Sequence, residues 1–414
     1  MFDLKGMFKK RVIHGACKFR IYPTDEQRIF FNKQFGCCRF IFNYLLIRTN
    51  KAYSRRKEST STYAAKKFIS PLKKTNRYNF LKEANSQSLQ ASALNLGTAR
   101  QKFFNGEGGR PRLKRKKGRQ SFEVPQNFLL KKSKNGNYYL LIPKLGSAIK
   151  IKVHREIPGE LRHVVISMEP DGLYYASVNY CKEEYCVTIY DPEKKEKKRG
   201  FDLGFIDLYK DNDGNEEKVP RYLRNTEGTI AKYQRNLARK KKGSNNKEKA
   251  RLKLAKTHSK VKNQRKDFIH KQSNKIVNEN QVLYFETLNI KGMMRNHCLA
   301  KSAVDAMLGE FIRQAKYKCE WRSKRFIQID RFEPSSKLCN VCGTKNNELK
   351  LHHRIWKCKI CHTSHDRDIN AAINIKKIGQ GMSEFTPAER TTAGCLLARW
   401  QPSWLDMKEA GSGS

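Results

Sequence analysis

The chain has 414 residues, of which 86 are lysine or arginine and 39 are aspartate or glutamate, so its formal charge is +47. That length suits roughly two to four structural units, and the charge causes self-repulsion unless a polyanion neutralises it. No apolar run reaches the roughly 18 residues that span a membrane, and the N-terminal stretch lacks the apolar segment of a signal peptide. Nucleic acid, not a membrane, is therefore the expected partner.

The first predicted elements are a strand over residues 14–22 and a long helix that Thr24 caps. The aromatic residues of this helix are expected in a core and not as a platform for stacked bases. A second helix is predicted over residues 86–104. On it, Gln87 and Gln90 have amides that can read adenine edges, but ordinary solvent exposure is the favoured interpretation.

A glycine-rich basic stretch, NGEGGRPRLKRKKGRQ, follows at residues 105–120 and predicts a loop. Contact with phosphates and a solvated linker are equally compatible with this composition. Residues 121–185 then change to short β-branched and aromatic runs separated by turns such as KNGN and PDG. They predict an antiparallel β-rich unit, specifically a small barrel.

The third unit opens with a predicted strand that carries Asp202 and runs toward an NDG turn. A helical zone at residues 226–279 leads to a second apolar strand, which ends at Glu286. After a further helix, a further strand and two cysteine pairs, the stretch HDRDINAAINI contains Asp366 and Asp368. A helix is predicted to begin directly after Asp368.

Four of the twelve cysteines have the spacing C-x2-C-x15-C-x2-C, which is typical of a zinc ribbon. They are Cys339, Cys342, Cys358 and Cys361. Four thiolates complete a tetrahedral zinc site and leave no open position, so the expected zinc is structural. The histidines nearby are expected to be bystanders: His352, His353, His362 and His365.

Asp202, Glu286 and one aspartate of the DRD triplet each stand at the end of an apolar segment or the start of a helix. Carboxylates among hydrophobic residues are costly unless a cation pairs with them. Three such acids at one sheet edge could hold two Mg²⁺ ions beside a phosphodiester. Three unrelated acids fit the spacing equally well.

The ordered set GFDLG, YFETLNIKGM, the paired CxxC motifs and HDRDINAAINI resembles the RuvC-like nuclease of the TnpB family. These transposon-encoded RNA-guided DNA endonucleases include Fanzor relatives and are related to type V CRISPR effectors. FRIYPTDEQ, GCCRFIFNYLL and GRPRLKRKKGRQSF are also similar to family stretches, so the resemblance covers nearly the whole chain. One departure is His362, because members usually have glycine after the last cysteine, and this brings the geometry of that turn into question.

The resemblance implies a multidomain α+β fold. Its expected parts are a wedge β-barrel (1–22 and 121–199), an inserted helical recognition domain (23–120), a RuvC-like nuclease of the RNase H fold (200–338 and 362–380), a zinc ribbon (339–361) and a largely disordered tail (381–414).

The implied function is cleavage of double-stranded DNA complementary to a transposon-derived guide RNA, next to a short flanking motif. Asp202, Glu286 and Asp368 would be catalytic and would hold two Mg²⁺ ions, and the four cysteines would hold Zn²⁺. In related type V effectors the matching acid is followed by one residue and then asparagine, which selects Asp368 and leaves Asp366 a supporting role. The expected particle is a monomer with one guide RNA, in the cytoplasm or nucleoid of a prokaryote or in the nucleus for a eukaryotic or viral relative.

Two other functions remain alternatives. A regulator derived from such a nuclease would bind RNA or DNA without cleavage, but loss of one acid would mark it, and all three are present. A DNA transposase with a similar acid triad would act without RNA.

Overall fold

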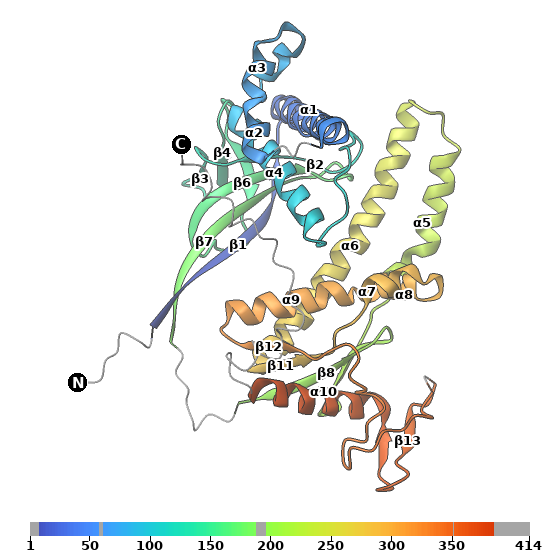
Figure 1. Cartoon of the computed structure of the whole chain (residues 1–414). Helices are drawn as coiled ribbons and strands as arrows, with labels where there is room; N and C mark the ends of the chain where they lie inside the picture. Colours follow the sequence, from blue (N-terminus) through green and yellow to red (C-terminus); the bar gives the residue numbers. More distant parts are fainter. Residues whose placement is uncertain (1–7, 58–60, 188–195, 351, 385–414) are drawn as a thin grey trace, which may run out of the picture. The chain divides into compact units, whose positions relative to one another are not determined.

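The computed structural model describes residues 8–57, 61–187, 196–350 and 352–384 (Figure 1). Most of the tail expected to be disordered, residues 385–414, lies outside this range. By internal contacts the chain divides into two compact units, one of Met1–Ile189 with Ile230–Ser259 and one of Tyr190–Thr229 with Lys260–Ser414. Among the described helices, none is long and apolar enough to cross a membrane.

The first unit contains a seven-stranded antiparallel sheet in the order β2-β6-β7-β1-β5-β4-β3. Its strands are β1 (Phe8–Tyr22), β2 (Gln120–Val124), β3 (Leu129–Lys132), β4 (Tyr138–Leu141), β5 (Ile149–Lys152), β6 (Glu160–Met168) and β7 (Tyr174–Val187). The order has two ends, β2 and β3, so hydrogen bonds between the described strands do not close the expected barrel. β1 begins six residues before its predicted start because it pairs with β7 from Phe8 to Ile21.

The helices of this unit are α1 (Asp25–Arg56), α2 (Thr62–Lys67), α3 (Ile69–Lys74), the 3-10 helix η2 (Asn76–Lys82) and α4 (Ser86–Phe104). The predicted cap at Thr24 is confirmed, because its hydroxyl accepts from the Gln27 backbone N–H at 3.3 Å and its own N–H donates to the Gln27 side chain at 3.1 Å. The expected aromatic core is also confirmed. Phe31 and Phe35 are buried, and their rings lie 5.9 and 5.4 Å from the ring of Phe122 on β2.

The basic stretch between α4 and β2 is a loop, as predicted. Its Lys114 backbone is fixed to α1, because the Asn43 side chain accepts from the Lys114 N–H at 2.8 Å and donates to the Lys114 carbonyl at 3.0 Å. On α4, Gln90 is exposed and Gln87 is half-buried. The contact of the loop with phosphates and the reading of adenine by the two glutamines stay predictions.

The second unit contains a five-stranded mixed sheet in the order β10-β9-β8-β11-β12. Its strands are β8 (Lys198–Leu203), β9 (Asp207–Asp211), β10 (Glu216–Lys218), β11 (Val282–Phe285) and β12 (Arg325–Gln328). β9 runs antiparallel to β8 and β10, whereas β11 runs parallel to both β8 and β12. The hairpin predicted at the NDG turn therefore joins β9 to β10.

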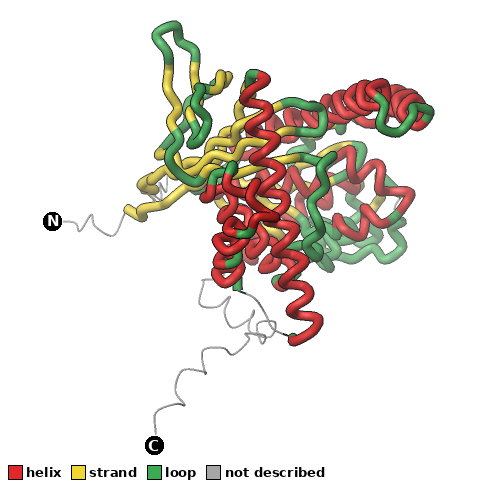
Figure 2. The backbone as a smooth tube through the Cα atoms, turned by 90° about the horizontal axis from the view of Figure 1, so that it is seen from above, coloured by secondary structure: helices red, strands yellow, loops and turns green. Residues whose placement is uncertain are grey.

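The remaining described helices are α5 (Tyr222–Ala238), α6 (Asn245–Glu279), α7 (Ile290–Arg295), α8 (His297–Ala306), α9 (Leu308–Trp321) and α10 (Arg367–Glu384). Residues 230–259 of α5 and α6 belong to the first unit, whereas the rest of α6 packs with α8 and α9 in the core of the second unit. Helices lie on both faces of the second unit's sheet (Figure 1), and Figure 2 shows the elements by type. Leu283 and Phe285 of β11 pack with Phe311 of α9, whereas Tyr284 packs with Ile375 of α10. Because side chains alternate along a strand, α9 and α10 lie on opposite faces.

Helix α10 approaches β8 closely because residue 200 is glycine. A Cβ at Gly200 would lie 2.3 Å from the carbonyl oxygen of Ala372 on α10. On the same helix, a Cβ at Gly379 would lie 2.2 Å from the ring of Tyr284. Both glycines therefore set the distance between α10 and the sheet.

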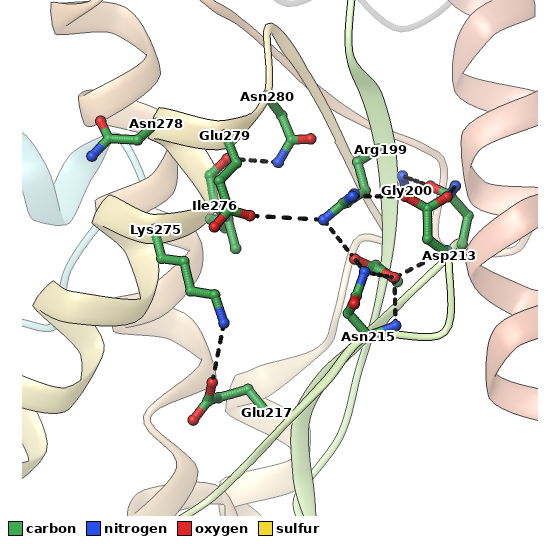
Figure 3. A network of polar contacts seen from close by, with 12 residues as sticks. Arg199, Gly200, Asp213, Asn215, Glu217, Lys275, Ile276, Asn278, Glu279 and Asn280 are labelled. Atoms are coloured by element: carbon green, nitrogen blue, oxygen red, sulfur yellow. Dashed lines mark hydrogen bonds and ion pairs between the residues drawn. The ribbon is translucent and has the colours of Figure 1, made fainter.

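A buried arginine fixes the start of β8 (Figure 3). The Arg199 guanidinium lies 2.9 Å from the Asp211 carboxylate, 2.7 Å from that of Asp213 and 3.8 Å from that of Glu279. Asp211, fully buried, also accepts from the Asn215 N–H at 2.8 Å. The network joins β8 to the β9–β10 turn and to the last turn of α6. Arg199, at its centre, lies three residues before Asp202 on the same strand.

Candidate functional site

The acids of the two central strands share one face of the sheet. Phe201 of β8 packs in the core with α9, so Asp202, the next residue, faces α10. Glu286 directly follows Phe285 and faces the same way. β8 and β11 are parallel neighbours, so their carboxyl ends meet at one edge. There the backbone N–H of Leu203 lies near enough to both carboxyl groups to lower the pKa of each, against the larger effect of burial.

The two aspartates of HDRDINAAINI differ in their contacts. The Asp366 carboxylate accepts from the backbone N–H groups of Asp368 at 2.9 Å and Ile369 at 3.0 Å, so it caps α10. Asp368 lies in the first turn of that helix, near enough to Asp202 for its charge to act on it. The structure thus brings Asp202, Glu286 and Asp368 together at the edge of the sheet and gives Asp366 a capping contact.

The pKa values of the acids reflect their burial and their neighbours. Burial, followed by the charges of Glu286 and Asp368, raises the pKa of Asp202 well above its ordinary value. Burial raises the pKa of Glu286 to about 7. Although burial opposes it, hydrogen bonds from the Ile369 and Asp368 N–H groups and the charge of Lys210 lower the pKa of Asp366.

Two cations that the sequence prediction missed lie beside the aspartates at the start of α10. Lys210 on β9 lies opposite Asp202 on β8 in the strand register. Its ammonium lies 3.5 Å from the Asp366 carboxylate and 3.7 Å from that of Asp368. Arg354, just before the strand β13 (Ile355–Lys357), lies 3.3 Å from both carboxylate oxygens of Asp368. The cross-strand position of Lys210 follows from the register of the hairpin, which its turn sequence only partly defines.

The donor chemistry fits hard divalent cations, because all three acids offer carboxylate oxygen. Among the described residues, these oxygens do not lie within 4.8 Å of one another as a set. They are too widely spread for one ion in this arrangement.

The four predicted zinc ligands form the tighter cluster. The sulfur atoms of Cys339, Cys342, Cys358 and Cys361 all lie within 4.8 Å of one another. Cys339 is 3.5 Å from Cys361, and Cys342 is 3.6 Å from Cys358. Tetrahedral zinc with bonds of about 2.3 Å requires sulfur atoms about 3.8 Å apart, so the cluster fits zinc.

The two knuckles have the same backbone hydrogen bonds. Cys339 N–H donates to Thr344 at 2.9 Å, and Cys358 N–H donates to Thr363 at 2.9 Å. Gly343 and His362 occupy equivalent positions, with φ of +74° and +56°. The turn geometry is therefore retained without glycine, at a conformational cost of about 1–2 kcal/mol for His362.

His365 is more than the expected bystander. It is buried, and its Nε2 atom lies 3.1 Å from the Cys339 sulfur. Its ring also lies 4.8 Å from that of Trp356. His365 thus orients a zinc ligand without joining the four-sulfur cluster, and such a contact depends on folded geometry that spacing does not reveal.

Asparagines of α10 bind the first knuckle to the helix that carries Asp368. The Asn370 side chain donates to the Leu338 carbonyl at 2.7 Å and accepts from the Asn340 N–H at 3.0 Å. One turn later, Asn374 donates to the Ser335 carbonyl at 2.8 Å. In addition, β14 (Ser364–Asp366), which pairs with β13 (Ile355–Lys357), runs directly into α10. The ribbon and Asp368 are therefore mechanically joined.

We predict one tightly bound zinc ion per chain, and its loss in Cys358→Ser. Because metal binding is coupled to folding of such ribbons, the variant should exchange amide hydrogens faster in α10 as well as in the ribbon. Elemental analysis and hydrogen exchange would measure both effects, with the exposed Cys298→Ser as the control. A folded wild-type protein without zinc would contradict this prediction.

The raised pKa of Glu286 predicts a pH-dependent stability difference. Its carboxyl is protonated in the folded state at pH values where the unfolded chain has ionised it. Its contribution to the free energy of unfolding is therefore complete below about pH 4.5 and is lost as the pH rises through about 7. Without added Mg²⁺, Glu286→Gln should gain thermal stability relative to wild type between about pH 5.5 and 8.

The control for this comparison is Glu310→Gln. Hydrogen bonds from Arg313 lower the pKa of Glu310, so its difference from wild type should stay constant over that range. If the thermal stabilities of the wild type and of Glu286→Gln changed in parallel with pH, the raised pKa of Glu286 would be contradicted.

Three family models match parts of the chain. They are OrfB_IS605, described as "Probable transposase", over residues 175–297; a Cas12f1-like TNB domain over 309–375; and a helix-turn-helix domain over 12–58. In the last range the structure has the strand β1 and the single helix α1, so that description does not match the fold observed here.

A candidate RNA-guided DNA endonuclease of Streptomyces pristinaespiralis is 34% identical over 374 residues, which cover 90% of each chain. The protein InsQ of Escherichia coli strain K12, also named as a candidate RNA-guided DNA endonuclease, is 26% identical and covers 89% of this chain and 92% of its own. In fold, the chain resembles the protein in the solved Cas12f1–sgRNA–target DNA complex, with a TM-score of 0.57, 13% identity and coverage of 88% and 99%. The chain belongs to the TnpB family of RNA-guided DNA endonucleases.

Proposed function

We propose that this protein uses a transposon-derived guide RNA to find complementary double-stranded DNA and cleaves it next to a short flanking motif. The observation that carries the proposal is the convergence of Asp202, Glu286 and Asp368 at one sheet edge in a chain of this family. The formal charge of +47 supports it, since an RNA scaffold and a heteroduplex supply compensating phosphates. The proposed particle is a monomer with one RNA.

The second unit is proposed to be a RuvC-like nuclease of the RNase H fold. Its antiparallel strands β10, β9 and β8, extended by the parallel strands β11 and β12, support this assignment. The proposed boundaries remain a wedge domain (1–22 and 121–199), a helical recognition domain (23–120), the nuclease (200–338 and 362–380) and a zinc ribbon (339–361).

The proposed cofactors are two catalytic Mg²⁺ ions and one structural Zn²⁺. When bound, the Mg²⁺ ions would stabilise the attacking and leaving oxygens of the phosphodiester. Asp202, Glu286 and Asp368 would hold them, and Asp366 would keep Asp368 in place by capping α10. Lys210 would keep positive charge beside Asp366 and Asp368.

A transposase remains the second candidate because one matching family model carries that description. It would join DNA strands without RNA. A silent regulator is less compatible with the site, since all three acids meet at the sheet edge.

RNA dependence is the direct test of the proposal. Protein purified with its RNA should cut matching DNA in Mg²⁺, and nuclease treatment that removes the RNA should abolish specific cutting. Sequencing the co-purified RNA supplies the target, and re-addition of that RNA should restore cleavage. Undiminished specific cutting after complete RNA removal would contradict an RNA-guided mechanism.

The two aspartates should respond differently to substitution. Asp368→Ala should reduce cleavage at least a thousandfold because it removes a proposed metal ligand, as should Asp202→Ala and Glu286→Ala. Asp366→Ala should lower the rate roughly ten- to a hundredfold, because loss of the cap costs about 1 kcal/mol or more and loosens Asp368. Rates are compared in RNA complexes matched for target binding. A more active Asp368→Ala than Asp366→Ala would reverse the assignment.

A further inference from the structure

A pocket of about 260 Å³ lies beside the turn that follows the Asp202 strand. Its lining comes from the β8–β9 turn, the segment before α5, the first turn of α5, and α8. The lining residues are Phe205, Ile206, Val219, Arg221, Arg224, Ser302 and Asp305. None of these residues belongs to the cluster of acids described above.

One side of the pocket is apolar and fixed by the backbone. The Val219 N–H donates to the Ile206 carbonyl at 2.9 Å, which joins the turn to the segment before α5. Phe205 and Val219 pack on the core of the second unit, whereas the Ile206 side chain is 56% exposed. An exposed isoleucine beside a half-buried phenylalanine offers apolar surface to a ligand.

The other side of the pocket is cationic. Arg221 and Arg224 are both exposed, and Arg224 donates to the Ser302 hydroxyl at 2.9 Å. Arg221 has φ of +51°, a strained conformation for a non-glycine residue. Strain of this kind is often retained at binding sites.

The acid in the lining does not cancel this charge. Asp305 is buried and lies 2.9 Å from the Arg265 guanidinium, and it accepts from the Leu223 N–H in the first turn of α5 at 3.1 Å. Its charge is thus compensated inside the fold. Arg221 and Arg224 remain available to an anionic ligand.

The pocket begins close to the proposed catalytic acids. The backbone N–H of Leu203, the residue after Asp202, lies near enough to Asp202 and Glu286 to lower the pKa of both, and Phe205 is two residues farther along the chain. Two residues span at most about 7 Å. This distance is comparable to the spacing of adjacent nucleotides in an extended single strand.

We propose that the pocket holds one unpaired nucleotide of the DNA strand being cut, next to the scissile phosphate. Its base packs on Phe205 and Ile206, and its phosphate lies at Arg221 and Arg224. An apolar surface joined to a cationic groove is the usual combination for single-stranded nucleic acid. The inference rests on the proposed endonuclease function and adds a nucleotide subsite to it.

The test uses full-length, RNA-loaded protein. Cut positions are first mapped with the wild-type complex, and the fluorescent base 2-aminopurine then replaces the nucleotide on either side of the cut. Asp202→Ala should bind the target without cutting it, and in this variant one of the two positions should change its fluorescence on binding. Ile206→Asp or Arg224→Ala, added to Asp202→Ala, should abolish or at least halve that change.

Arg235→Ala is the matched control, because Arg235 is an exposed arginine farther along α5. In the otherwise wild-type protein, Ile206→Asp and Arg224→Ala should slow cleavage roughly tenfold with unchanged RNA and target binding, and Arg235→Ala should not. Fluorescence changes that survive both pocket variants would overturn the subsite. A wild-type complex that never cuts would instead contradict the proposed function.

Discussion

Repulsion between carboxylates that the fold holds together is the constraint on which the second unit depends. Asp202, Glu286 and Asp368 come from two strands and a helix and meet at one edge of the sheet. Burial raises the pKa values of Asp202 and Glu286, and the charges of Glu286 and Asp368 raise that of Asp202 further, so the arrangement disfavours its own full ionisation. Lys210 and Arg354 offset part of this repulsion. Divalent cations would offset more of this repulsion. The repulsion between the acids therefore favours the metal ions that the proposed chemistry needs.

The surrounding structure keeps the acids from moving apart. Gly200 allows α10 to lie directly on β8, and Arg199 fixes the start of the same strand to α6 and to the β9–β10 turn. At the other end of the cluster, Asn370 attaches the first zinc knuckle to α10. The zinc ribbon therefore acts as a support for the helix that carries Asp368, although its sulfur-bound metal would have no open position for chemistry.

Features with local causes were predictable from the sequence, whereas contacts between distant segments were not. The Thr24 cap, the bounds of α4 and the four-cysteine cluster depend on residues a few positions apart or on a fixed spacing, and the structure has all three. Lys210, Arg354 and the contact between His365 and Cys339 depend on strand register and on folding of the ribbon. Hydrogen bonds between the described strands do not close the expected barrel, and short β-rich runs predict strands but not their partners.

The most direct test of the account is the number of divalent ions that the acids hold. Mn²⁺ can be titrated into zinc-loaded protein and counted by electron paramagnetic resonance, which requires neither RNA nor cleavage. The account predicts two bound Mn²⁺ ions in the wild-type protein and the loss of at least one in Asp368→Asn, with both retained in Asp366→Asn. Equal Mn²⁺ binding by the wild-type protein and by a variant that lacks Asp202, Glu286 and Asp368 would contradict it.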